Sequence, residues 1–276
     1  YLARQLRTNA APKLALIIVD GLALNQWFVL REVVQAHLPT VQWDERALFA
    51  WMPTLTPVSR QAILAGRLPQ EFAESLQHTN REETLWQHFW QRQYISSSQV
   101  FYQRGLGRVD DLAPLAATLK VAPYRVVALI INKVDDIMHG MQLGMAGMLN
   151  QVRQWGEQGY LARLIAILLN QGWRLYLTSD HGNIEATGIG LPREGAAAEL
   201  RGERVRVYRD ERLLQQTRAE YPEAVTWPAI GLPADYLSLL APSRKAFIRE
   251  GVRTVSHGGL SIEELVVPFV EIKVPA

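Results

Sequence analysis

The 276-residue sequence contains no cysteine, so disulfide bonds and thiolate metal sites are both excluded. Any bound metal must then be held by carboxylate, imidazole or hydroxyl groups. The lack of cysteine agrees with a reducing compartment, and we expect a soluble, cytoplasmic protein. No apolar run reaches membrane-spanning length, and residues 1–12 lack the apolar core of a signal peptide. We therefore expect no membrane association.

The sequence also lacks a strong excess of either charge. It has 29 Lys and Arg against 27 Asp and Glu, a net charge of +2 that is spread along the chain. This balance does not by itself indicate a nucleic-acid-binding protein. With 48% hydrophobic and 20% charged residues, the chain is long enough for one large α/β domain. We expect residues 1–276 to form that single domain, excised from a longer protein, because the chain starts without Met and residues 1–8 have the composition of a helix end.

Three continuous apolar runs with β-branched residues predict strands buried on both faces of a sheet. They cover residues 14–19, 125–131 and 173–178. An acidic residue follows each run: Asp20, Asp135 and Asp180. Ligands of open α/β sheets bind beyond the carboxyl ends of the strands, so these carboxylates are candidates for function. Asp and Gly also favour ordinary turns, which is the simpler explanation of Asp20-Gly21 taken alone.

Helical spacing and turn residues predict the remaining elements. We expect helices at residues 25–37, 56–66, 81–93, 141–170 (with interruptions at Gly156 or Gly159) and 210–220, and strands at 94–101, 203–208 and 265–270. Residues 183–202 are rich in Gly, Ala and Glu and predict a surface excursion, a candidate lid, to which we assign no structure. Pro268 predicts that the last strand is an edge strand or carries a bulge.

Residues 53–66 have a sequence pattern that would place a hydroxyl side chain at the start of a helix. Thr56 precedes a helical run that ends at Gly66. The free amides and the dipole of a helix start favour an anion such as phosphate, so Thr56 is a candidate nucleophile. Thr is also a common helix cap, and Thr54 is a second candidate two residues earlier.

Three of the six histidines, His139, His181 and His257, lie beside or soon after strand ends or in a Gly-rich turn. Together with the three carboxylates they form the mixed oxygen and nitrogen set that suits a pair of divalent ions such as zinc. Two metals about 4 Å apart can clamp the attacking and leaving oxygens of a phosphoryl transfer. The other three histidines (His37, His78 and His88) lie outside these motifs, and we expect them to be structural or on the surface.

The order of these motifs resembles the alkaline phosphatase superfamily, including its nucleotide pyrophosphatase/phosphodiesterase branch. The sequence is most similar to the PglZ domain of bacterial phage-defence (BREX) systems, and the resemblance spans nearly the whole chain. It is carried by Pro53-Thr54-Leu55-Thr56, Asn132-Lys133-Val134-Asp135-Asp136 with His139, Asp180-His181-Gly182, and Ser256-His257-Gly258-Gly259 followed by Glu263-Glu264-Leu265-Val266-Val267-Pro268.

The resemblance implies a three-layer α/β sandwich, with helices on both faces of a mostly parallel sheet, and two metal sites. One site would comprise Asp135, His139 and His257, and the other Asp20, Asp180, His181 and Thr56. Zinc is the expected metal, with manganese and magnesium as alternatives. Thr56, deprotonated on its metal, would attack phosphorus to form a phospho-threonine, which a water on the other metal would hydrolyse. Asp136 could replace Asp135, although only Asp135 has the four-residue spacing to His139 that the family shows.

The resulting prediction is a metal-dependent phosphodiesterase of anti-phage defence, acting on a phosphoester that could be a nucleotide or nucleic acid and working with other defence proteins. Two alternatives remain: a catalytically silent phosphatase-like scaffold, and a metal-dependent phosphomonoesterase or mutase. The diester preference rests on the lack of a dedicated cation for a second phosphate charge, since we expect Arg60 to point elsewhere and Lys133 to face the sheet. Asn132-Lys133-Val134-Asp135 also imitates a GTPase motif, but the sequence has no phosphate loop.

Overall fold

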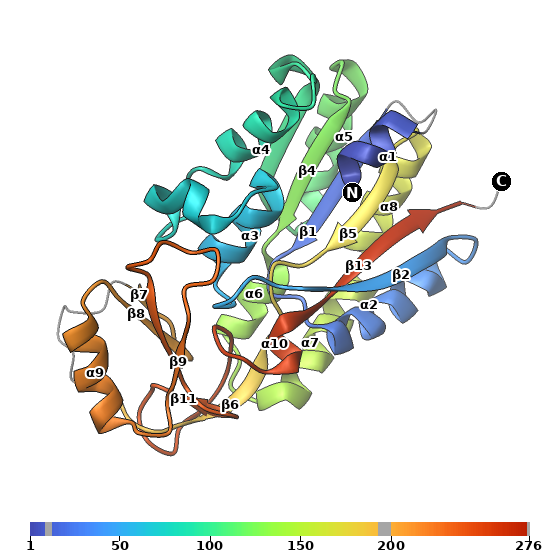
Figure 1. Ribbon diagram of the computed structural model, residues 1–276. Helices are drawn as coiled ribbons and strands as arrows, with labels where there is room; N and C mark the ends of the chain where they lie inside the picture. Colours follow the sequence, from blue (N-terminus) through green and yellow to red (C-terminus); the bar gives the residue numbers. More distant parts are fainter. Residues whose placement is uncertain (9–12, 193–199, 275–276) are drawn as a thin grey trace.

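The computed structural model describes residues 1–8, 13–192 and 200–274. Its centre is a six-stranded sheet in the order β2-β13-β5-β1-β4-β3 (Figure 1). The strands are β1 (Leu14–Val19), β2 (Gln42–Phe49), β3 (Val100–Leu106), β4 (Val126–Ile131), β5 (Arg174–Thr178) and β13 (Val266–Lys273). The four strands from β5 to β3 are parallel, whereas β13 is antiparallel to both of its neighbours. The predicted α/β class with a mostly parallel sheet is confirmed.

The two central strands are buried along their whole length because helices cover both of their faces. In β1, Ala15, Ile17 and Val19 face one hydrophobic cluster, and the alternate residues of the strand face another. Side chains of a strand alternate between the faces of its sheet, so a strand between two helical layers needs apolar residues at every position. This is the physical reason for the continuous apolar runs in the sequence.

Helices form a layer on each side of the sheet (Figure 1). One layer contains α2 (Leu24–His37), α5 (Leu112–Val121), α7 (Gly144–Glu157) and α8 (Tyr160–Asn170). The other contains α1 (Leu2–Thr8), α3 (Thr56–Ala65) and α4 (Glu82–Gln91). The predicted three-layer sandwich is therefore present. Short helices connect these elements: η1 (Pro69–Ser75), η2 (Ser97–Gln99), η3 (Val109–Asp111), α6 (Lys133–His139) and α10 (Ile262–Leu265).

A smaller lobe, at the lower left of Figure 1, is inserted between β5 and β13. It contains a four-stranded sheet and α9 (Glu211–Glu220); the strands are β7 (Leu200–Arg201), β8 (Val205–Tyr208), β10 (Leu237–Leu240) and β9 (Val225–Trp227). A second small sheet contains β11 (Lys245–Ala246), β6 (Ile184–Gly188) and β12 (Arg253–Ser256). Because β12 ends at Ser256, the lobe returns the chain to the main sheet at His257.

Several predicted elements differ from the structure. The strand predicted at residues 94–101 lies at 100–106, at one edge of the main sheet. The long helix predicted at 141–170 is divided into α7 and α8 at Gly159, which has a left-handed φ of 77°. Gly156 does not interrupt α7. The strand β2 was not predicted, and no structure was expected for the segment that begins with β6; residues 193–199 of that segment lie outside the described residues.

Pro268 is not in an edge strand, because β13 lies between β2 and β5. Its register with β2 is continuous, so no bulge is present either. The pairing of β13 with β5 begins only at Phe269, and Pro268 is thus paired on one side alone. The missing N–H of proline is tolerated at such a position.

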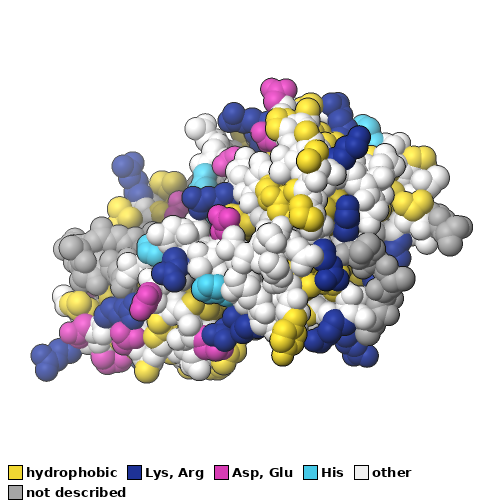
Figure 2. Space-filling model, turned by 90° about the horizontal axis from the view of Figure 1, so that it is seen from above, with side chains coloured by type: hydrophobic (Ala, Val, Ile, Leu, Met, Phe, Trp, Pro, Cys, Tyr) yellow, Lys and Arg dark blue, Asp and Glu magenta, His cyan; other side chains and the backbone are white. Residues whose placement is uncertain are grey.

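Lys and Arg side chains are spread over the whole face shown in Figure 2, whereas the acidic groups lie on its left and upper parts. On this face the modest positive charge of the chain is not gathered into one patch. Among the described residues, no helix is both long enough and apolar enough to cross a membrane.

Candidate metal centre

The seven residues predicted for the site come together at the carboxyl edge of the main sheet. Asp20 follows β1, Asp180 and His181 follow the neighbouring strand β5, and Thr56 is the first residue of α3. The other three candidates are Asp135 and His139 of α6, which follows β4, and His257, which follows β12. Three adjacent parallel strands and the return from the small lobe thus place these side chains at one edge.

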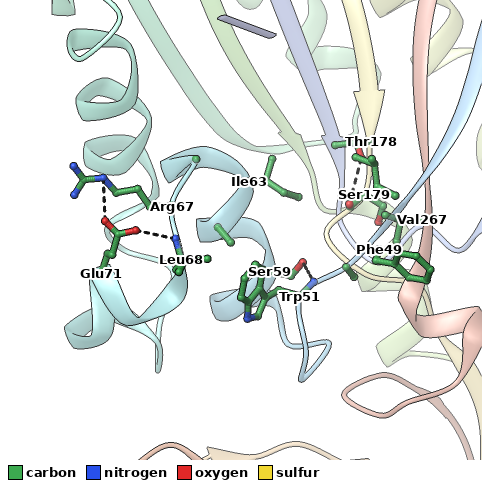
Figure 3. A pocket seen from close by; sticks show the side chains of 14 residues that line it. Phe49, Trp51, Ser59, Ile63, Arg67, Leu68, Glu71, Thr178, Ser179 and Val267 are labelled. Carbon is green, nitrogen blue, oxygen red and sulfur yellow. Dashed lines mark hydrogen bonds and ion pairs between the residues drawn. The ribbon is translucent and has the colours of Figure 1, made fainter. Parts of the chain in front are cut away.

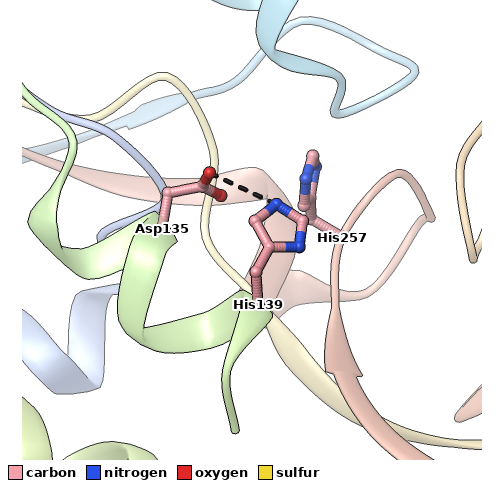
Figure 4. Close-up of side chains that lie close together, drawn as sticks. All are labelled: Asp135, His139 and His257. Carbon is pink, nitrogen blue, oxygen red and sulfur yellow. Dashed lines mark ion pairs between the residues drawn. The ribbon is translucent and has the colours of Figure 1, made fainter. Parts of the chain in front are cut away.

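Asp135, His139 and His257 form the first group (Figure 4). Each offers one ligand atom, and these atoms lie within 4.8 Å of one another. Asp135 and His139 are four residues apart in α6 and hence on the same helical face, with His139 Nε2 3.3 Å from Asp135 Oδ2. The His139 side chain is 68% exposed, so this group is open to solvent.

Asp20, Asp180 and His181 form the second group, which is buried and whose ligand atoms also lie within 4.8 Å of one another. Thr56 Oγ1 is 3.0 Å from His181 Nε2, so the candidate nucleophile borders this group. The rings of His181 and His257 are stacked, with centroids 3.8 Å apart and an interplanar angle of 7°. The two groups are therefore neighbours.

Backbone carbonyls orient both of the stacked histidines. His181 Nδ1 donates to Gly182 O at 3.0 Å, and His257 Nδ1 donates to Thr54 O at 2.7 Å. A carbonyl can only accept a hydrogen bond, so each neutral ring carries its proton on Nδ1 and keeps the lone pair on Nε2. Both histidines are thus held in the tautomer that leaves Nε2 available to bind a metal.

Each of the two groups contains one buried carboxylate oxygen without a hydrogen-bond partner: Asp20 Oδ1 in the second group and Asp135 Oδ1 in the first. Buried oxygens of this kind are costly unless a donor or a cation satisfies them. A divalent cation in each group would bind one of them, and three carboxylates with three imidazoles are a donor set that suits zinc better than magnesium. The residues present therefore fit a pair of metal ions.

The expectation that Arg60 points away from the site is wrong. Its buried guanidinium contacts Asp20 Oδ2 through Nη1, lies 3.4 Å from Asp180 Oδ2, and donates to Glu82 Oε1 at 2.7 Å. Arg60 is four residues after Thr56 and so lies on the same face of α3, a signal that the sequence contains. Asn132 Nδ2 also donates to Asp20 Oδ2, at 3.0 Å.

Burial dominates the electrostatics of the second group. It raises the pKa of Asp20, although the Arg60 charge opposes the rise. It raises the pKa of Asp180 well above the ordinary value, and repulsion from Asp20 adds to the effect. It also holds the pKa of His181 well below its ordinary value, with the nearby His257 acting in the same direction. His181 is therefore neutral and available as a ligand.

The first group shows the opposite balance. Burial acts to raise the pKa of Asp135, but the hydrogen bond from His139, with the nearby His257 acting in the same direction, brings the net pKa below its usual value. The hydrogen bond to Asp135 raises the pKa of His139. In the metal-free protein, Asp135 and His139 are thus stabilised as an ion pair.

The start of α3 offers fewer free amides than the sequence predicts. Pro57 has no N–H, and the N–H groups of Val58 and Ser59 both donate to Leu55 O, at 3.0 and 2.9 Å. The Leu55 N–H donates to Pro53 O at 2.7 Å. The Thr56 amide is then the one first-turn amide of α3 without a bond described above. The helix start therefore contributes less to anion binding than expected.

The structure also places the two residues that the sequence left as alternatives, Thr54 for Thr56 and Asp136 for Asp135. Thr54 is fully buried, and its hydroxyl bonds to the backbone of Gly258 and Gly259. Asp136 is exposed and belongs to neither group. Among the described residues, neither group contains His37, His78 or His88. Sequence reasoning missed the supporting roles of Arg60 and of Thr54, which depend on contacts between distant segments.

A separate hollow of about 460 Å³ lies beside α3 (Figure 3). Trp51, Ser59 and Ile63 line one side, and Ser179 and Val267 line the other. None of the seven candidate residues borders it. The hollow is therefore adjacent to the candidate centre without being part of it.

Comparison with known families agrees with this arrangement. The model of the PglZ family, described as the alkaline phosphatase-like domain of BREX systems, matches residues 2–272. The chain belongs to the PglZ family. A search of curated protein sequences found no match to this PglZ domain.

Solved structures share its fold at low sequence identity. Human ectonucleotide pyrophosphatase/phosphodiesterase 5 has a TM-score of 0.69 and 12% identity, covering 96% of this chain and 88% of its own. An inactive form of the murine enzyme in complex with AMP has a TM-score of 0.68 and 12% identity, covering 94% and 87%. Phosphonoacetate hydrolase from Sinorhizobium meliloti, with phosphonoacetate, has a TM-score of 0.62 and 12% identity, covering 95% and 90%. At this identity the likeness establishes the fold alone.

Proposed function

We propose that this PglZ domain is a two-metal phosphoester hydrolase in which Thr56 is the nucleophile. The observation that carries the proposal is the position of Thr56 Oγ1, 3.0 Å from His181 Nε2, beside two neighbouring groups of three potential ligands. Family membership supports hydrolase chemistry. A silent scaffold is less well supported, because every candidate position holds a side chain able to bind a metal or attack phosphorus.

The proposed ligands are Asp135, His139 and His257 for one ion, and Asp20, Asp180, His181 and Thr56 for the other. We propose zinc, with manganese or magnesium as alternatives. Bound cations would supply a lowered pKa for a coordinated hydroxyl or water and would neutralise charge on the phosphate. The protein supplies orientation: Gly182 O and Thr54 O hold the imidazoles, and Arg60 holds Asp20.

In the proposed reaction the Thr56 oxygen bonds to phosphorus as the bond from phosphorus to the leaving oxygen breaks. Thr56 gives up its hydroxyl proton to solvent, and the leaving group departs with the electron pair of the broken bond. Water then cleaves the bond between Thr56 and phosphorus: its oxygen stays on phosphorus, and one of its protons restores the Thr56 hydroxyl. Covalent catalysis of this kind divides one difficult displacement into two easier ones.

We further propose a preference for phosphodiesters. A monoester carries nearly two negative charges and usually needs an additional cation. Arg60 contacts the candidate ligands but is already paired with three carboxylates, so it is not free to bind a second phosphate charge. A diester, with one charge, makes no such demand. We place this activity in BREX anti-phage defence, on a nucleotide or nucleic-acid phosphoester, with other defence proteins as cytoplasmic partners.

The test compares kcat/KM for bis(p-nitrophenyl) phosphate and p-nitrophenyl phosphate in the same buffer and metal. The proposal predicts a higher value for the diester, because only the monoester leaves a charge unneutralised. A monoester value equal to or above that of the diester would refute the preference. Absence of hydrolysis of both esters by the zinc-, manganese- and magnesium-loaded protein would count against the hydrolase itself.

A further inference from the structure

Thr54 lies two residues before Thr56 and connects the nucleophile segment to the loop that carries His257. Its hydroxyl accepts a hydrogen bond from Gly258 N at 3.0 Å and donates one to Gly259 O at 3.1 Å. Its carbonyl accepts the bond from His257 Nδ1 at 2.7 Å. The residue is fully buried, so water cannot replace these bonds.

The loop after His257 depends on such bonds because its own side chains cannot hold it. Gly258 has a φ of 115°, a backbone conformation that other residues rarely adopt. A Cβ at Gly258 would approach Val205 Cγ1 to 2.8 Å, and one at Gly259 would approach Arg204 Nη2 to 2.4 Å. The loop is therefore packed tightly against the small lobe and is oriented through its backbone.

We infer that the Thr54 hydroxyl is a positioning group for the metal site of Asp135, His139 and His257. It fixes the Gly258-Gly259 turn, and the turn keeps the His257 ring on the Thr54 carbonyl with Nε2 directed at Asp135 and His139. The inference rests on the proposed metal centre, to which it adds a residue that binds neither metal nor substrate.

Removal of the Thr54 hydroxyl breaks its hydrogen bonds to the Gly258 amide and the Gly259 carbonyl, which are then left in the buried surroundings of Thr54 without this partner. Loss of a partner that orients a metal ligand typically costs 10- to 100-fold in affinity. The loss should be selective, since the carbonyl that orients His181 is Gly182 O and not that of Thr54. A general destabilisation of the fold would instead weaken both sites.

The test is a zinc titration against a chromophoric chelator, which resolves the two affinities, for wild type, Thr54→Val and Thr54→Ser. Val keeps the shape and removes the hydroxyl, whereas Ser keeps the hydroxyl. We expect Thr54→Val to weaken one site at least tenfold and leave the other within about threefold. Thr54→Ser should retain both wild-type affinities, and it remains informative if Thr54→Val does not fold.

A matched control is Thr217→Val in the small lobe. Thr217 is also buried, and its hydroxyl accepts from Tyr208 and donates to Leu213 O, so the same group is lost far from the site. This variant should bind zinc as wild type does.

A second control uses a His257→Ala background, which already lacks the oriented ligand. In that background Thr54→Val should cause no further loss of zinc affinity.

Equal affinities in wild type and Thr54→Val would overturn this inference and leave the proposed metal centre intact. Equal weakening of both sites, or weakening of either site by Thr54→Ser, would also overturn it. If the wild-type protein binds no zinc, the metal centre and the inference fail together.

Discussion

At the scale of single residues, the hydrogen bonds of the histidines and carboxylates determine which of their atoms are available to a metal. His181 and His257 use Nδ1 for the protein and leave Nε2 for a ligand. Asp20 and Asp180 share Arg60, which offsets part of the repulsion between two buried carboxylates. Asp20 Oδ1 and Asp135 Oδ1 remain without donors. Arg60 therefore neutralises only part of the negative charge of these carboxylates, and the remaining oxygens are available to a cation.

The pKa directions predict that metal binding strengthens with pH. In the metal-free protein the pKa values of Asp180 and His139 are raised, so each group holds its proton to a higher pH than usual. A metal must displace those protons, and its affinity therefore rises with pH until both groups are deprotonated. His181, with a lowered pKa, is already neutral and adds nothing to the dependence near neutral pH.

Calorimetric zinc titrations in two buffers of different ionisation enthalpy measure this proton release. We expect protons to be released on binding at pH 6, and fewer at pH 8. The same titration with His139→Ala should release fewer protons at pH 6 than wild type. A zinc affinity that is constant between pH 6 and pH 8, with no proton release, would contradict the raised pKa values of Asp180 and His139.

At the scale of elements, a buried ion pair joins the small lobe to the main sheet. Glu264 of α10 accepts from Arg204 Nε and Nη2 at 2.8 and 2.9 Å, and from Gly259 N at 2.7 Å. Both ionised side chains are buried. This contact gives Glu264, in the motif that follows His257, a structural role, because Glu264 accepts from the Gly259 amide while Thr54 bonds to the Gly258 amide and the Gly259 carbonyl.

Glu264→Gln should therefore destabilise the protein strongly. It removes one charge of a buried pair and leaves Arg204 uncompensated, at a cost of about 3 kcal/mol or more. Urea unfolding measures the change. The matched control is Glu263→Gln, whose pair with Arg244 is partly exposed and is worth at most about 1 kcal/mol. Equal effects of the two variants would show that the buried pair has no special role.

The elements differ in how far their sequence predicts them. The strands β1, β4 and β5 are predictable because burial on both faces demands uninterrupted apolar residues. In contrast, β2 has an exposed, charged sequence and pairs only with β13, more than 200 residues away, so no local pattern marks it. The candidate metal ligands were predicted from their positions at strand ends and from the family motifs. The contacts of Thr54 depend on the assembled fold, whereas the four-residue spacing of Arg60 from Thr56 was a signal in the sequence that the prediction did not use.

At the scale of the whole molecule, the candidate centre joins the most distant parts of the chain. Asp20 follows the first strand of the sheet, and His257 arrives only after the small lobe is complete. Metal ions bound by these residues would hold β1, β5, α3, α6 and the β12 return together. Such ions bind the folded state and not the unfolded chain, so they should stabilise the whole protein.

Chelation should accordingly lower the melting temperature. A metal present at 1,000 times its dissociation constant contributes about 4 kcal/mol to the free energy of unfolding. Calorimetry of the metal-loaded protein and of the chelator-treated protein measures the difference, and readdition of zinc should restore it. His257→Ala should show a smaller chelator effect because one site is already weakened. Identical melting curves with and without chelator would count against resident metals.

The most direct test of the account is the location of the covalent intermediate. The protein would be quenched in acid during turnover of bis(p-nitrophenyl) phosphate and digested for mass spectrometry. The account predicts a p-nitrophenyl phosphoryl group on Thr56, absent from Thr56→Ala, which should fold and retain at least one metal while turning over several orders of magnitude more slowly. An adduct on Thr54, or undiminished turnover by Thr56→Ala, would contradict it.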